Sequence, residues 1–100
     1  MFLSYVCLSQ TAISDPNFEQ ALIDLGLDTA PINGSVPTAN ISSITSLNVE
    51  TKNISDLTGI QDFLALTSLN CNNNQLTNLN VSQNTTLLQL FCNDNVLTSL

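Results

Sequence analysis

The chain has 100 residues, of which 43% are hydrophobic and only 9% are charged. Its formal net charge is -7, because 8 acidic residues stand against 1 basic residue. This balance argues against nucleic acid and anionic membrane surfaces as partners, since both bind through lysine and arginine. There is no histidine, which excludes a histidine base and a histidine metal ligand. The acidic residues are scattered, and we expect them to form a solvated coat.

The first twelve residues look like the back half of a secretory signal peptide. An apolar run from Met1 to Leu8 is followed by the small and polar residues 9–12, without a positively charged front region. We therefore predict a signal-peptide remnant over residues 1–12, from a reading frame that starts late, and a secreted or cell-surface protein. The alternative is a short apolar strand that caps the fold. No segment approaches the roughly 20 apolar residues that cross a bilayer, so no transmembrane segment is expected.

A helix is predicted over about residues 16–25. Asp15 is a suitable N-cap, Pro16 suits the first helical position, and Gly26 is a natural stop. A helix with one apolar face cannot bury that face alone, so we expect it to cover the open end of the structure that follows. The apolar face consists of Phe18, Ala21, Leu22 and Leu25.

The helix belongs to a predicted N-terminal cap over residues 13–43. Its second part, residues 27–40, is rich in turn residues and includes Asn33-Gly34, so we predict a loop or a short hairpin. Residues 28–34 resemble a calcium loop only faintly, because they contain one carboxylate where such loops use several. No metal or other cofactor is expected.

The rest of the chain repeats itself. The pattern L-x-x-L-x-C-x-x-N-x-L begins at Leu66 and again 21 positions later at Leu87. An earlier copy begins at Ile44 and has Lys52 in place of the asparagine. A fixed period of about 20–29 residues with this spacing is typical of a leucine-rich repeat. The copies cover residues 44–65, 66–86 and 87–100, and the last of them is incomplete.

Each copy contains two similar halves. The pattern L-x-x-L-x-V-x-x-N follows at Leu76, 10 positions after Leu66. Two similar halves predict a short strand on both sides of each coil, rather than a strand and a long helix. The predicted fold class is an α/β leucine-rich-repeat solenoid, β-rich, with short strands stacked in coils and an N-terminal helical cap.

Two sets of repeat positions are expected to be structural. Asn74, Asn84 and Asn95 lie where the chain turns, and there an amide side chain can satisfy backbone groups that the turn leaves unpaired. Cys71 and Cys92 share one inward position, which predicts a ladder of buried thiols. The alternative for the cysteines is a disulfide, which demands a specific geometry.

The outward residues of the strand side form the expected contact surface, because side chains alternate between the two faces of a strand. Leu88 and Phe91 are the expected anchors, since large exposed apolar residues on a sheet can mark a binding site. The alternative is that each is a singly exposed apolar residue, which is common. The candidate binding residues are Asn48, Glu50, Asn70, Asn72, Leu88, Gln89, Phe91 and Asn93.

The array resembles the bacterial leucine-rich repeats with nested half-repeats of secreted and cell-surface proteins of the Bacteroidetes, flavobacteria especially. Residues 15–26 resemble the lead-in of that family, and residues 54–60 resemble its first-repeat signature, which is also similar to internalin-type adhesins. The resemblance covers about residues 13–100 and implies a non-catalytic module that binds a protein or a glycan. The alternative is a structural spacer or stalk that displays another domain beyond residue 100.

Overall fold

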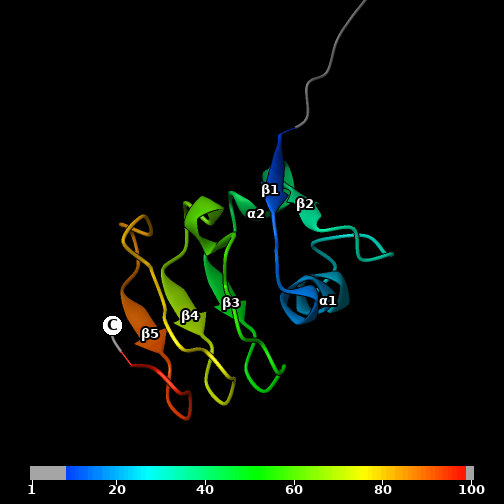
Figure 1. Ribbon diagram of the computed structural model, residues 1–100. Coiled ribbons are helices and arrows are strands. Elements are labelled where there is room, and N and C mark those ends of the chain that lie inside the picture. Colours follow the sequence, from blue (N-terminus) through cyan, green and yellow to red (C-terminus); the bar gives the residue numbers. More distant parts are fainter. Residues whose placement is uncertain (1–8, 99–100) are drawn as a thin grey trace, which may run out of the picture.

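The computed structural model describes residues 9–98, in which successive turns of chain stack side by side and a small cap covers one end (Figure 1). No helix within this part of the chain is long and apolar enough to span a membrane. The elements are β1 (Gln10–Ala12), α1 (Pro16–Asp24), β2 (Ser35–Pro37), α2 (Thr38–Ile41), β3 (Ser46–Asn48), the 3₁₀ helix η1 (Ile60–Asp62), β4 (Ser68–Asn70) and β5 (Gln89–Phe91).

Three strands, one from each copy of the repeat, form a parallel sheet in the order β3-β4-β5. Equivalent positions lie opposite one another, so that Leu47 pairs with Leu69 and Leu69 with Leu90. A constant repeat length produces this register, because each turn of chain returns to the same height beside the one before it. The sheet therefore presents repeated positions in straight rows.

The inward side chains of these turns form one continuous hydrophobic core. Leu47, Leu69 and Cys71 are buried beneath the sheet, whereas the neighbouring residues of each strand are more exposed, as the alternation of a strand requires. The core continues into the cap, where Phe18 of α1 stacks on Phe63 of the first turn with ring centroids 6.4 Å apart. The cap and the repeats are thus held by a shared core.

The predicted strand on the second side of each turn is wrong for the described residues. Residues 76–84 contain bends and turns but no strand, and the first turn has only η1 on this side. Local hydrogen bonds explain the difference: the Asn80 carbonyl Oδ1 accepts from the backbone N–H of Ser82 at 3.0 Å, and Asn84 N donates to the Val81 carbonyl at 2.9 Å. Such bonds bend the backbone out of a regular ladder.

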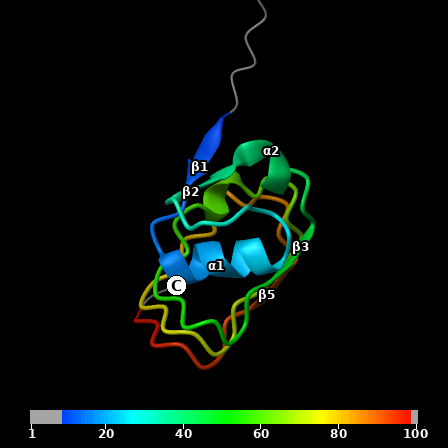
Figure 2. The ribbon, with the colours of Figure 1, turned by 90° about the vertical axis from the view of Figure 1, so that its right-hand side faces the viewer.

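The cap helix ends one residue before the predicted end, and this changes one side chain. Asp15 caps its first turn, accepting from the backbone N–H groups of Asn17 at 2.8 Å and Phe18 at 3.4 Å. Leu25 follows the last helical residue and is half exposed, so its predicted place on the buried face is wrong. Figure 2 shows α1 lying across the end of the stacked turns.

The turn-rich segment does not form a hairpin with itself. Its strand β2 pairs antiparallel with β1, with Thr11 opposite Val36, and α2 follows directly. The sheet of the cap therefore begins at Gln10, before the predicted boundary at residue 12. The rest of the predicted signal-peptide remnant, residues 1–8, lies outside the described residues.

The first turn makes room for the cap strand at a glycine. Gly59 has a φ of 113°, and a Cβ there would lie 2.9 Å from the Ala12 carbonyl oxygen and collide with the Ile13 side chain. Only glycine adopts this left-handed backbone without strain while allowing such a close approach. Gly59 therefore belongs to the contact between cap and repeats.

Candidate binding surface

The sheet presents its outward side chains in two rows that cross all three strands. The register places equivalent residues side by side, and parallel strands lie about 4.8 Å apart. The second row has asparagine on β3 and β4 and an aromatic residue on β5. The rows are Ser46, Ser68 and Gln89, and then Asn48, Asn70 and Phe91.

The two apolar candidates are exposed on or beside the same strand. Leu88 directly precedes β5 and is 83% exposed, and Phe91 ends β5 and is 43% exposed. β5 is one of the two edge strands of the sheet in the described part of the chain, the one far from the cap. Both predicted anchors are therefore accessible, Phe91 within the second row and Leu88 just before the strand begins.

The asparagine candidates use their amide oxygens within the fold. Asn48 Oδ1 accepts from Glu50 N at 3.0 Å, and Asn70 Oδ1 accepts from Asn72 N at 3.1 Å. Asn72 Oδ1 in turn accepts from Asn93 N at 2.6 Å. These bonds stabilise the chain where it leaves each strand. Asn48, Asn70 and Asn72 thus have a structural task where the chain leaves the strands.

Glu50 accepts hydrogen bonds from two of these asparagine side chains. Its carboxylate accepts from Asn48 Nδ2 at 3.5 Å and from Asn70 Nδ2 at 3.4 Å, so one acid is tied to two turns of the array. Glu50 also lines a recess of about 540 Å³ between the cap and the first turn, together with Asp24 and Lys52. This recess could not be predicted from the sequence, because its walls come from segments far apart in the chain.

A second groove lies over η1 and the facing part of the second turn. Its volume is about 300 Å³, its floor includes the buried Leu57 and Leu79, and amide side chains such as Gln61 and Gln83 line it. Within the described residues no group of three or more Asp, Glu, Cys or His side chains could hold a metal ion.

Asn74 fills the predicted position at the exit from β4 and is buried. Its Oδ1 accepts from the backbone N–H groups of Lys52 and Ile54, both at 3.0 Å. Its Nδ2 donates to the carbonyls of Val49 and Cys71, both at 3.0 Å. One side chain therefore bonds the backbone of two successive turns, where the turning chain cannot pair with itself.

The two other predicted asparagines also bind backbone, Asn95 through both amide atoms and Asn84 through its Nδ2 alone, since the buried Asn84 Oδ1 has no partner among the described residues. Asn95 Oδ1 accepts from Leu76 N at 3.1 Å, and its Nδ2 donates to the Cys92 carbonyl at 3.2 Å. Asn84 is buried on the opposite side and donates to the Ile60 carbonyl at 2.9 Å. These contacts place the asparagines in the framework of the repeats rather than on the contact surface.

Cys71 and Cys92 are both free thiols, at equivalent positions of neighbouring turns. Cys71 is buried and Cys92 is half-buried. Burial, followed by the neighbouring Cys92, raises the pKa of the Cys71 thiol to about 11. A thiol reacts as its thiolate, so Cys71 is chemically silent in the folded protein near neutral pH.

We therefore expect Cys71 to escape alkylation by iodoacetamide at about pH 8 while the protein is folded. The same thiol should be modified once guanidinium unfolds the chain. Peptide mass spectrometry measures both, with the unfolded sample as the control for reagent activity. Equal modification of Cys71 in the folded and unfolded samples would contradict its place in the core.

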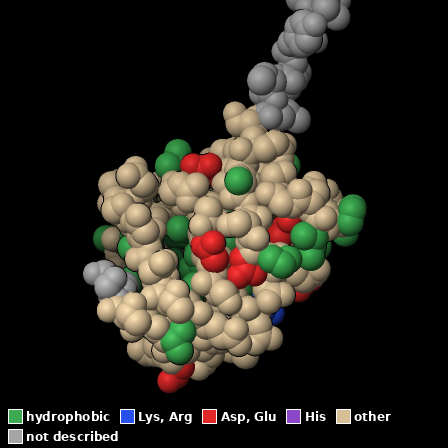
Figure 3. All heavy atoms as spheres, viewed as in Figure 1, with side chains coloured by type: hydrophobic (Ala, Val, Ile, Leu, Met, Phe, Trp, Pro, Cys, Tyr) green, Lys and Arg blue, Asp and Glu red, His purple; other side chains and the backbone are tan. Residues whose placement is uncertain are grey.

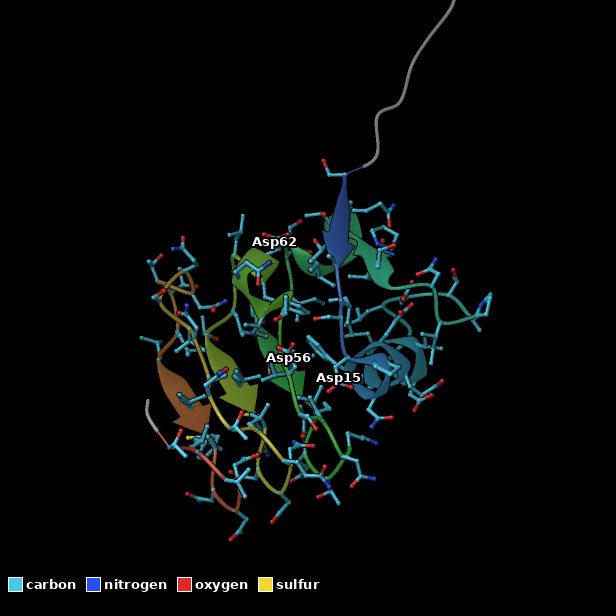
Figure 4. The ribbon with its side chains drawn as sticks, viewed as in Figure 1. Asp15, Asp56 and Asp62 are labelled. Carbon is cyan, nitrogen blue, oxygen red and sulfur yellow. The ribbon has the colours of Figure 1, made fainter. Side chains whose placement is uncertain are left out.

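Not all of the acidic residues form the solvated coat that their scatter predicts. Asp15, Glu19 and Asp28 are buried. Asp15, Asp56 and Asp62 lie along the contact between the cap and the first turn (Figure 4), and acidic atoms gather on the same face in Figure 3. The position of these acids at the contact could not be predicted from the sequence, because they come from separate segments of the chain.

Each of the three labelled acids accepts hydrogen bonds across that contact. Asp15 Oδ2 accepts from the backbone N–H of Ser55 at 2.7 Å, and Asp62 Oδ2 accepts from the Thr11 hydroxyl at 2.8 Å. Asp56 Oδ2 accepts from the Ser14 hydroxyl at 3.2 Å. The hydroxyl of Thr58 is the main cause that lowers the pKa of Asp56, with smaller contributions from the Thr58 N–H and from Ser14.

Solved structures with a similar fold include internalin-type leucine-rich-repeat proteins. The functional domain of InlJ from Listeria monocytogenes, described as including a cysteine ladder, is 29% identical over 97% of this chain, with a TM-score of 0.79. The internalin InlF from the same organism is 26% identical over 86% of this chain, with a TM-score of 0.76. The CBM51-2 and INT domains of ZmpB from Clostridium perfringens are 20% identical over 88% of this chain, with a TM-score of 0.71.

The chain has the leucine-rich-repeat fold of these structures. It spans only 22% of the InlJ chain, 25% of the InlF chain and 18% of the ZmpB chain. No protein-family pattern matches it, and no curated protein matches it in sequence.

Proposed function

We propose that the chain is a non-catalytic binding module of a secreted or cell-surface protein, and that it contacts a protein partner through the outward face of β3, β4 and β5. The observation that carries the proposal is the exposed pair Leu88 and Phe91 beside two polar rows in strict register. Apolar anchors flanked by polar groups are the usual anatomy of a protein interface. A glycan is the second class of ligand that the amide-rich rows could bind.

The similar solved structures support a module of this kind. They include the functional domain of InlJ and the internalin InlF, which are 29% and 26% identical to this chain. The likeness supports an extracellular binding role here.

The test removes the anchor pair and measures binding to whole cells or cell extracts. We expect Leu88→Ala with Phe91→Ala to weaken binding by roughly tenfold or more, since an interface anchor commonly contributes over about 2 kcal/mol. Leu64→Ala is the matched control, because Leu64 is 59% exposed but lies between η1 and β4, away from the outward rows. Equal binding by the double variant and the control would refute the proposed contact surface.

A structural spacer is the alternative function. It is favoured by the identical residues in the first two turns, Ser46 with Ser68 and Asn48 with Asn70, whose amide oxygens already bond their own backbone. A spacer should bind neither cells nor extracts in any variant. The Bacteroidetes type and a solenoid that continues beyond residue 100 stay predictions of the sequence.

A further inference from the structure

Two carboxyl groups are buried inside the N-terminal cap without a basic partner. Glu19 of α1 is fully buried at 0% exposure, and Asp28 in the following loop is 7% exposed. The chain has one basic residue, Lys52, and its side chain is exposed. A buried carboxylate costs several kcal/mol unless hydrogen bonds or an opposite charge compensate it. Something other than a cation of this chain must therefore stabilise the two acids.

Glu19 is compensated by backbone N–H groups of the loop that folds back over it. Its Oε1 accepts from Gly34 N at 2.7 Å, and its Oε2 accepts from Asn33 N at 3.0 Å. The turn at Gly34, with a φ of 85°, presents both N–H groups to the same carboxylate. Glu19 thus acts as an acceptor through both of its oxygens and draws the loop onto α1.

Asp28 is compensated on one oxygen only. Its Oδ1 accepts from Thr29 N at 2.8 Å, whereas its buried Oδ2 has no hydrogen-bond partner among the described residues. Burial is the main cause that raises the pKa of Asp28, the adjoining Glu19 carboxyl raises it further, and the Thr29 N–H lowers it. Glu19 is the titratable group that faces Asp28. Two carboxylate oxygens are both acceptors and cannot bond to each other, so the pair is incomplete without a hydrogen.

We propose that Asp28 and Glu19 share one proton, held between Asp28 Oδ2 and the Glu19 carboxylate, and that this proton fastens residues 28–34 to α1. The bound proton turns the unpaired oxygen of Asp28 into a donor and leaves one negative charge in the cap instead of two. The cap is then a proton-binding site that is independent of any partner bound on the strand face.

The sign of the pH dependence follows from the raised pKa of Asp28. A group whose pKa is higher in the folded than in the unfolded chain stabilises the fold below its unfolded value, and the stability is lost as the pH rises through the folded value. Asp56 has a lowered pKa, so its contribution is lost in the opposite direction, as the pH falls below the ordinary range of aspartate. The two effects therefore occupy separate parts of the pH scale.

The experiment follows thermal unfolding of the full chain from about pH 4 to about pH 8 by circular dichroism. The melting temperature of the wild type should fall as the pH rises. Asp28→Asn should remove most of that fall, because the Asn amide donates the same hydrogen bond at every pH. Asp24→Asn is the matched control, since Asp24 is exposed at the end of the same helix, and it should keep the wild-type profile. Wild-type and Asp28→Asn profiles that fall in parallel would overturn the proposal.

A second measurement needs no variant. Carboxyl carbon chemical shifts of the wild type should titrate for Asp28 with a midpoint clearly above about 3.9, the ordinary value for aspartate. An ordinary midpoint would overturn the proposal even if Asp28→Asn failed to fold.

Thermal unfolding with excess calcium at about pH 8 tests whether the two acids bind a metal ion instead of a proton. A rise in the wild-type melting temperature that Asp28→Asn lacks would assign the pair to a cation and also overturn it.

Discussion

Asn74→Ala is expected to destabilise the protein by about 3 kcal/mol, near the upper end of the cost of buried groups that lose their hydrogen bonds. The wild-type side chain bonds the N–H groups of Lys52 and Ile54 and the carbonyls of Val49 and Cys71. Alanine leaves these backbone groups buried between two turns, where water reaches them poorly. Because both turns are affected, the loss should appear in the cooperative unfolding of the whole array.

Urea denaturation gives the free energy of unfolding for the comparison. Asn78→Ala is the matched control, because Asn78 is an exposed asparagine of the same turn and its truncation should change stability by less than about 0.5 kcal/mol. A value for Asn74→Ala equal to that of the control would mean that Asn74 does not join the turns. Asn74→Asp is expected to destabilise the protein at least as much as Asn74→Ala at neutral pH, since its second carboxylate oxygen would face the Val49 and Cys71 carbonyls.

The repeat length made the sheet register predictable from the sequence. Leu47, Leu69 and Leu90 are separated by 22 and 21 residues, and turns of nearly equal length bring equivalent residues together. The buried asparagines were predictable for the same reason, since a polar residue at a fixed inward position must find backbone partners. The periodicity of the sequence therefore predicted both the sheet register and the buried asparagines.

The second side of each turn could not be predicted in this way. Leu76 and Leu79 have the same spacing as Leu66 and Leu69, and both pairs are buried, but of the four only Leu69 lies on a strand. Spacing fixes which residues point inward. Whether the backbone also pairs depends on local bonds such as that between Asn80 and Ser82, which compete with a ladder.

The cap was the least predictable part, because its structure depends on contacts between distant short segments. β1 and β2 have only three residues each, so neither shows a strand pattern of useful length, and α1 separates them in the sequence. Glu19 reads as the polar side of an amphipathic helix, and its burial follows only from the loop at Asn33 and Gly34 folding over it. The candidate contact rows were predictable, but the recess beside Glu50 was not.

Asp15 connects the cap to the first turn, and its replacement is expected to have the second large effect. One carboxylate oxygen caps α1 through Asn17 N at 2.8 Å. The other accepts from the backbone N–H groups of Ser55 at 2.7 Å and Asp56 at 3.0 Å. Hydrogen bonds to a buried charged group contribute about 1.5–3 kcal/mol, so Asp15→Ala should cost about 3 kcal/mol once both oxygens are lost.

Asp15→Asn separates the two tasks of this side chain. The amide oxygen can still cap α1, but the amide N–H₂ then faces the N–H groups of Ser55 and Asp56, where donor meets donor. We expect Asp15→Asn to cost about 2 kcal/mol by urea denaturation, with the helix content retained in the circular dichroism spectrum. Asp24→Asn, an exposed change of the same type at the end of α1, should cost less than about 0.5 kcal/mol.

The local reporter of this contact is hydrogen exchange at the amides of Ser55 and Asp56. In the wild type the carboxylate protects both N–H groups, and exchange measures the free energy of opening at that point. Asp15→Asn should speed exchange at these two amides more than at the amides of β4, which lie a full turn away. Uniform acceleration along the chain would instead mean that Asp15 acts only through global stability, and the role of its carboxylate as the joint between cap and repeats would be wrong.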